Sequence, residues 1–195
     1  MAGAATEAAP PKTAIFLCDC GKEIASIIDM KGLLASCRLL SSVVHVERSP
    51  YLCQKDAVKE IKAKMEQHFG VTLTDGRLRE AVRVHNESRR LQRELYNLRK
   101  AKAPPITGAQ SLAVTVAGTA MPKPRFNDCL KALLAELRGA PGHSGHRARL
   151  MLLGGILDDP AYLEVIEERG GLIVADSTCF GSRLFWQDVD EDADD

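Results

Sequence analysis

The sequence predicts an α/β protein in which a small βαβ-type unit is followed by a helical segment and then by a second strand, helix and strand. Three observations support this prediction. Short apolar runs suited to buried strands lie near both ends of the chain, at residues 13–18 and 172–175. Both runs are followed by turns that contain cysteine. Between them, one stretch has apolar residues every three or four positions, which is typical of an amphipathic helix.

Composition limits the class of protein. The 195 residues, 45% of them hydrophobic, can bury one ordinary core or two small ones. Lys plus Arg equals Asp plus Glu at 26 each, so no net field attracts nucleic acid or an anionic membrane. No run of about 18 apolar residues is present, and the first residues lack the features of a signal peptide. We therefore expect a cytoplasmic protein with neither nucleic acid nor membrane as partner, and disordered tails at residues 1–12 and 188–195.

The first unit is expected to span residues 13–64. A strand over Thr13–Cys18 is followed by a cysteine turn and a helix that starts near Glu23. A second strand is expected at Val43–Val46, and a second helix at Lys55–Lys64. The helical pattern ends at about Lys64 and a different sequence pattern begins, so the second unit is expected to begin at about residue 65.

Three cysteines of this unit are candidate metal ligands. Cys18 and Cys20 follow the first strand, and Cys53 follows the second. Parallel strands end at one edge of a sheet, so these cysteines are expected to converge there, beside helix N-termini that favour anionic thiolates. The alternative is simple burial, because free cysteine is a common core residue and one Cys-x-Cys pair is a weak signal. Cys37 is either a fourth ligand or part of a helix interior. Without paired Cys-x-x-Cys knuckles, an iron–sulfur cluster is favoured over zinc.

Residues 13–63 also resemble the N-terminal segment of the heterodisulfide reductase A-type subunit, a flavin and iron–sulfur electron carrier. The resemblance rests on Cys18-Asp-Cys20-Gly21 and on Tyr51-Leu-Cys53. It implies that Cys18, Cys20 and Cys53 ligate a cluster. The glycine motif, flavin domain and ferredoxin-like cysteine runs of that family are absent, so flavin binding is not implied.

A long helix is expected from Thr74 or Asp75, as cap, to about Ala101, before Pro104-Pro105. Its apolar stripe comprises Ala81, Val84, Ser88, Leu91, Leu95 and Leu98. Between residues 75 and 102 there are seven Arg and two Lys against one Asp and three Glu. This basic surplus is either a solvated face or a docking face for a partner subunit or the phosphates of coenzyme A, which arginine forks suit.

Two further helices are expected at residues 109–120 and 125–138, separated by a Pro-containing corner. Cys129 lies among leucines in the second of them and is expected to be buried. His143 and His146 have metal-like spacing in a Gly/Ser loop, which is more typical of a plain loop. The sequence has neither a Gly-x-Ser-x-Gly elbow nor a Gly-x-x-x-x-Gly-Lys loop, so serine hydrolase and nucleotide hydrolase functions are not supported.

The last part of the chain is expected to form a partial parallel-sheet unit of the flavodoxin or Rossmann type. A buried strand over residues 149–153 leads to Gly154-Gly155 and to a helix ending at Arg169. The strand at residues 172–175 then places Cys179 at the same sheet edge as the glycine pair, where ligands collect in such folds. Gly154 and Gly155 would allow a cofactor or substrate to approach the backbone, and Cys179 is a candidate metal ligand.

Several stretches of residues 65–190 resemble the 2-hydroxyacyl-CoA dehydratase and benzoyl-CoA reductase family, D-component type. They are residues 86–91, 94–100, 121–122, 157–160 and 175–186. The resemblance implies that Cys179 ligates an iron–sulfur cluster of the [4Fe-4S] type. It also implies a second dehydratase or reductase subunit, an ATP-dependent activator or other electron donor, and an acyl-CoA that receives one electron.

The chain departs from that family in two ways. Full members carry an N-terminal domain with a first cluster cysteine, and they continue beyond the Cys179 segment to a further cysteine, whereas this chain ends 16 residues after Cys179. One cysteine cannot hold a cluster alone. Two functions are therefore expected from the sequence: a partial dehydratase or reductase subunit acting on an acyl-CoA, or a non-catalytic electron-transfer or adaptor protein that holds a cluster at Cys18, Cys20 and Cys53. A folded remnant without a cluster is the third alternative.

Overall fold

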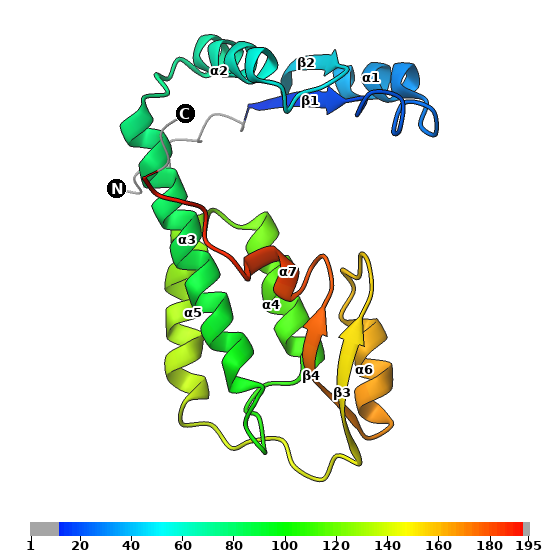
Figure 1. Cartoon of the computed structure of the whole chain (residues 1–195), viewed down its shortest axis with the longest axis vertical. Helices are drawn as coiled ribbons and strands as arrows, with labels where there is room; N and C mark the ends of the chain where they lie inside the picture. Colours follow the sequence, from blue (N-terminus) through cyan, green and yellow to red (C-terminus); the bar gives the residue numbers. More distant parts are fainter. Residues whose placement is uncertain (1–11, 193–195) are drawn as a thin grey trace, which may run out of the picture. The chain divides into compact units, whose positions relative to one another are not determined.

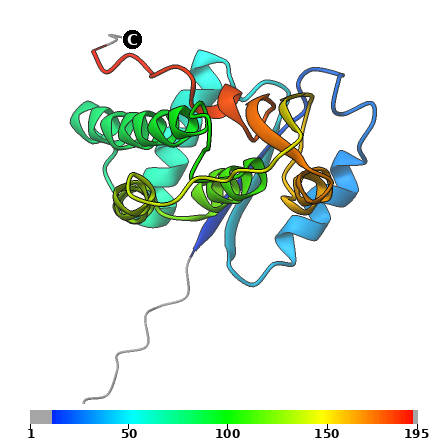
Figure 2. The same ribbon diagram turned by 90° about the horizontal axis from the view of Figure 1, so that it is seen from below.

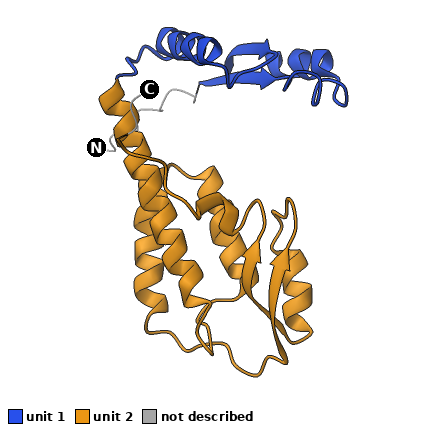
Figure 3. Ribbon diagram, viewed as in Figure 1, with its two compact units in different colours: residues 1–74 blue, residues 75–195 orange. Residues whose placement is uncertain are grey.

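The computed structural model describes residues 12–192 and confirms the α/β class (Figure 1). The chain divides into two compact units, residues 1–74 and residues 75–195 (Figure 3). Within the described residues, none of the helices has the length and apolar character needed to cross a bilayer.

The first unit contains β1 (Thr13–Cys18), α1 (Met30–Arg38), β2 (Val43–Ser49) and α2 (Lys55–Phe69). The two strands pair in parallel, with Cys18 opposite Ser49, as the strand, helix and strand order predicts. The buried apolar residues of this unit, among those described, are Met30 and Cys37. Cys37 thus belongs to a helix interior, the second of its two interpretations.

Two helix limits in this unit differ from the prediction. The helix expected near Glu23 begins at Met30, because the Asp29 carboxylate accepts hydrogen bonds from the Lys31 and Gly32 amides and caps it there. The chain between Cys20 and Asp29 makes turns instead. The helix expected to end at Lys64 continues to Phe69 and ends at Gly70, whose φ of 63° is left-handed. Position 64 therefore lies inside α2, and the units divide between Thr74 and Asp75.

The second unit contains, in order, α3 (Asp75–Leu98), α4 (Gly108–Ala120), α5 (Lys123–Leu137), β3 (Ala148–Leu153), α6 (Ala161–Glu168), β4 (Gly171–Ser177) and α7 (Ser182–Phe185). β3 and β4 pair in parallel, so the expected strand, helix and strand unit is present. α3 packs on α5, while α4 and α6 pack on β4 and on each other (Figures 1 and 2). One core cluster joins α3 and α5 and comprises Leu91, Leu95, Ile106, Phe126, Leu130 and Leu134.

A second core cluster joins α4 and α6 to the sheet. It comprises Ala109, Leu112, Leu163 and Ile173. Thr107 and Gln110 fix the start of α4 with a reciprocal capping box. Gly108 lets this helix end approach β4 closely, because a Cβ at that position would lie 2.5 Å from Cβ of Ile173. The close contact holds α4 against the strand that leads to Cys179.

Two burial predictions in this unit are wrong. Cys129 is exposed, because Phe126, Leu130 and Leu134 supply the face of α5 that enters the core and Cys129 lies off that face. β3 is not a buried strand: Met151 is 60% exposed. Parallel strands are usually covered on both faces. Here β3 pairs only with β4 among the described residues, and its outer face has no covering element there.

Candidate functional site

A short loop, residues 178–181, joins β4 to α7 and carries the exposed Cys179. The Ser182 amide donates to Asp176 Oδ1 over 2.7 Å, and the Ser182 hydroxyl donates to the Asp176 carbonyl over 2.7 Å. A Cβ on Gly181 would lie 2.0 Å from Asp176 Oδ1, so only glycine fits between the loop and this carboxylate. The loop is therefore fixed at its base, while the Cys179 thiol faces outward.

A buried ion pair holds the base of this loop to the turn that follows α3. Arg99, which is 2% exposed, donates to Asp176 Oδ2 over 2.6 Å and to the Ile173 carbonyl over 3.0 Å. The Asp176 amide donates to the Tyr96 hydroxyl over 3.4 Å. Asp176 thus joins β4, the Cys179 loop and α3, and its carboxylate is paired with Arg99 and the Ser182 amide.

The predicted meeting of the glycine pair and Cys179 at one sheet edge is found. The Cys179 amide donates to the Gly155 carbonyl over 3.1 Å, and the Gly154 amide donates to the Ser177 carbonyl over 3.4 Å. No atom lies within 4 Å of a Cβ placed on either glycine. Open space therefore adjoins the backbone of Gly154 and Gly155, as the approach of a cofactor or substrate would require.

The cluster implied by the sequence has an incomplete ligand set. A [4Fe-4S] cluster is held by four cysteine thiolates, and the Cys179 loop would supply one of them. Among residues 12–192, no three His, Cys, Asp or Glu side chains are grouped so that they could hold a metal ion. The described residues therefore do not fit a cluster by themselves at Cys179, nor do they at Cys18, Cys20 and Cys53.

Cys18 and Cys20 nevertheless lie together at the carboxyl ends of the first sheet. Their Sγ atoms are 3.7 Å apart. The amides of Leu52 and Cys20 each donate to Cys18 Sγ over 3.4 Å. These two donors lower the pKa of Cys18. The contact with Cys18 raises the pKa of Cys20, and the negative charge of a Cys53 thiolate raises it further. Cys53 is exposed in the turn that follows β2.

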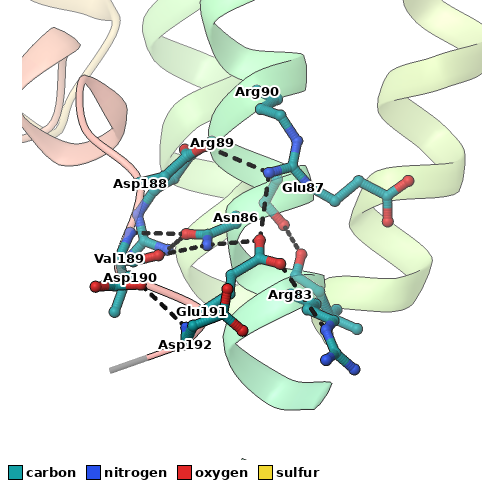
Figure 4. Close-up of polar contacts among 12 residues, drawn as sticks. Arg83, Asn86, Glu87, Arg89, Arg90, Asp188, Val189, Asp190, Glu191 and Asp192 are labelled. Atoms are coloured by element: carbon teal, nitrogen blue, oxygen red, sulfur yellow. Dashed lines mark hydrogen bonds and ion pairs between the residues drawn. The ribbon is translucent and has the colours of Figure 1, made fainter. Parts of the chain in front are cut away.

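Part of the basic face of α3 pairs with the chain's own acidic segment, contrary to the prediction of a disordered tail from residue 188 (Figure 4). Asp188 pairs with Arg93 at 2.8 Å and with Arg90 at 3.3 Å. Asn86, which is fully buried, donates to the Val189 carbonyl and accepts from the Val189 amide, at 2.8 and 2.9 Å. Residues 188–192 are held in place by these ion pairs and by the hydrogen bonds of the Asn86 side-chain amide. Residues 193–195 lie outside the described residues, as do residues 1–11 of the expected N-terminal tail.

Sequence reasoning does not single out the residues that fix the site. In the sequence, Arg99 is one of many basic residues of a helix, and Asp176 is one polar residue of a loop. Asn86 and Asn127, both buried, bind backbone atoms of other segments. The available signal is position: Asn86 lies close to the apolar stripe of α3 and Arg99 directly follows its last residue, Leu98, where a polar side chain needs a buried partner.

The arrangement defines a class of α/β proteins in which an exposed cysteine and a glycine turn stand at the carboxyl end of a parallel sheet, where ligands and cofactors bind. The family model described as 2-hydroxyglutaryl-CoA dehydratase, D-component, matches residues 16–195. The chain belongs to this family. The match begins well before residue 65, the expected start of the resemblance. The likeness to heterodisulfide reductase stays a prediction.

Several curated proteins are similar to this chain. The beta subunit of (R)-2-hydroxyglutaryl-CoA dehydratase from Acidaminococcus fermentans is 29% identical over 71% of this chain and 37% of its own length. A benzoyl-CoA reductase component from Thauera aromatica is 26% identical over 68% of this chain and 35% of its own. A putative dehydratase component of Escherichia coli is 28% identical over 77% of this chain and 43% of its own length. The matched part of the chain thus spans less than half the length of each of these relatives.

Proposed function

We propose that this chain is an iron–sulfur-dependent component of a 2-hydroxyacyl-CoA dehydratase or benzoyl-CoA reductase-type system. In this proposal Cys179 provides one ligand of a cluster, and a second protein chain provides the ligands that the described residues lack. The cluster, when bound, would supply single electrons for transfer to an acyl-CoA thioester. The observation that supports the proposal best is the exposed Cys179 at the tip of a fixed loop, in a chain of the D-component family.

The residues around Cys179 suit a shared ligand site. The thiol is exposed, so a second chain can reach it. The Asp176 and Ser182 contacts hold the loop in one conformation, and a preorganised ligand loses less freedom on binding. Gly154 and Gly155 leave open space next to the loop for a cofactor, an acyl-CoA or partner backbone.

A second candidate function is a non-catalytic electron-transfer or adaptor protein. It is favoured by one observation, the contact between Cys18 and Cys20 at the end of β1. In that case Cys18, Cys20 and Cys53 would be cluster ligands, a larger redox complex would supply the ligands that they lack, and α3 would dock onto that complex. The two functions place iron in different units of the chain.

The test is the iron and acid-labile sulfide content of the chain, purified anaerobically from its native host together with bound partners. The proposal predicts that Cys179→Ala lowers the iron content to background, while Cys20→Ala leaves it unchanged. Cys129→Ala is the matched control, because Cys129 is also exposed but lies on α5. Loss of iron only in Cys20→Ala would support the adaptor function. A wild-type chain that carries its partners but no iron would contradict both functions.

A further inference from the structure

We propose that Cys18 and Cys20 form a reversible dithiol and disulfide pair, which exchanges with low-molecular-weight disulfides such as oxidised glutathione. This inference concerns the first unit and does not depend on the function proposed for Cys179. It assigns a redox modification site to the turn that follows β1.

The first argument is distance. The Sγ atoms of Cys18 and Cys20 lie 3.7 Å apart, which is van der Waals contact between sulfurs. A disulfide needs a sulfur separation of about 2.05 Å, so closure requires a displacement of less than ~2 Å, within reach of a side-chain rotation. Among the described cysteines, these two have their sulfur atoms in contact, whereas Cys37 is buried in α1.

The second argument is the environment of Cys18. Two backbone amides, from Leu52 and Cys20, point at its sulfur at 3.4 Å, and backbone donors stabilise a thiolate. The nearest carboxylate, Asp19, would oppose the thiolate, but Arg48 pairs with it at 2.6 Å. Cys20 is exposed, so a small disulfide can reach the pair from solvent. Thiolate character and access together determine cysteine reactivity.

The third argument is the backbone of the turn. Cys20 has a φ of 46°. Among the described residues, it is the one residue other than glycine whose φ is positive. Such a conformation costs free energy for a residue with a Cβ and is held by its surroundings. Gly21 follows with a φ of 67° and approaches Tyr51 so closely that a Cβ would lie 2.5 Å from the Tyr51 hydroxyl. The turn is therefore built to keep Cys20 folded back toward Cys18.

The exchange balances in atoms and electrons. The Cys18 thiolate attacks one sulfur of the small disulfide, forming a mixed disulfide and releasing one thiolate. The Cys20 thiol gives its proton to solvent, and its sulfur attacks Cys18 Sγ to release the second thiolate. Two cysteine thiols are oxidised to one disulfide, and the small disulfide is reduced to two thiols. Reduced glutathione reverses both steps.

The test equilibrates the fully reduced, metal-free full chain with defined mixtures of reduced and oxidised glutathione, followed by acid quenching, alkylation and peptide mass spectrometry. The proposal predicts a peptide with a Cys18 to Cys20 bond, two hydrogen atoms lighter than the reduced form. Because closure is intramolecular, this form is expected to exceed glutathione adducts at the same cysteines by roughly tenfold or more.

Two variants complete the design. Cys20→Ser should leave a stable glutathione adduct on Cys18, because the resolving sulfur is missing, whereas Cys129→Ser should leave the Cys18 to Cys20 bond unaffected. Glutathione adducts on wild-type Cys18 and Cys20 without an internal bond would overturn the proposal. So would a Cys20 to Cys53 bond as the main product. Neither outcome bears on the iron content of Cys179→Ala, so the two proposals fail separately.

Discussion

Asp176 is the residue on which the Cys179 loop depends. Its carboxylate accepts from Arg99 on one side and from the Ser182 amide on the other, and both it and Arg99 are buried. A buried charge without its partner is strongly unfavourable, whereas an exposed ion pair contributes little. This difference separates Arg99 from the other arginines of the basic segment.

Replacing Arg99 should therefore destabilise the second unit. Arg99→Met is expected to lower the free energy of unfolding by about 3–5 kcal/mol, because Asp176 is left buried and unpaired. Urea unfolding followed by the fluorescence of Trp186, the one tryptophan of the chain, measures this loss. Arg83→Met is the matched control: Arg83 is 53% exposed beside Glu80, so the expected loss is below ~1 kcal/mol. Equal losses in both variants would contradict the role given to Arg99.

Glycine at position 181 is required by space, and glycine at position 154 is not. Gly181→Ala is expected to lower the free energy of unfolding by about 1–3 kcal/mol, since the new methyl group collides with Asp176 and Thr178. Hydrogen exchange of residues 177–183 should increase in parallel. Gly154→Ala should change neither quantity, because its Cβ enters open space and its φ is not positive. If Gly154→Ala lost the ability to bind a ligand at this turn, the loss would come from contact between the new methyl group and the ligand, because stability is unchanged.

At the scale of elements, α3 and the acidic segment at residues 188–192 act as a pair. Asn86 anchors the segment through both backbone groups of Val189, and the arginines of α3 pair with Asp188 and Glu191. The basic surplus of α3 is thus partly neutralised within the chain. An anionic partner that binds this face has to displace the segment first.

The contact of Asp188 with Arg90 and Arg93 should be lost at low pH. Partial burial opposes the ionisation of Asp188, but Arg93 and Arg90 outweigh it and hold the pKa below the ordinary value of 3.8. A lowered folded pKa means that the contact is at full strength above the unfolded pKa and is lost as the pH falls through the folded one. The Asn86 side-chain amide resonance should therefore stay constant from about pH 7 to pH 5 and move to a free position below about pH 3.8.

Asp188→Asn is the control for that titration. The variant keeps the size of the side chain but has no charge to lose, so the Asn86 resonance should no longer change with the protonation of residue 188. High salt should weaken the arginine contacts in the wild-type chain, because exposed pairs are screened. An Asn86 resonance in the wild-type chain that does not respond to acid would contradict the proposed role of Asp188.

At the scale of the whole molecule, the two units differ in the size of their cores. Among the described residues, two buried apolar side chains belong to the first unit and thirteen to the second. A two-stranded sheet with few buried residues is only marginally stable. The first unit also exposes large apolar side chains, with Ile27 at 85% and Leu39 at 86%.

The first unit should therefore unfold before the second. Heating the full chain is expected to expose the amides of β1 and β2 to hydrogen exchange at a temperature at which Trp186 fluorescence is still native. Exchange measured by mass spectrometry at increasing temperature, with fluorescence recorded in parallel, tests this order. A single transition seen by both probes would show instead that the units unfold together.

Local sequence patterns were sufficient to predict the α/β class, the order of the strands and helices, and the meeting of Cys179 with Gly155, because periodicity and the parallel pairing of successive strands specify these features. Which faces are covered became known only from the packed chain. Cys129 is exposed, the outer face of β3 has no covering element among the described residues, and the acidic segment is held by α3. The pairing of Arg99 with Asp176 joins residues far apart in the chain. Such contacts depend on how elements pack, which no local pattern encodes.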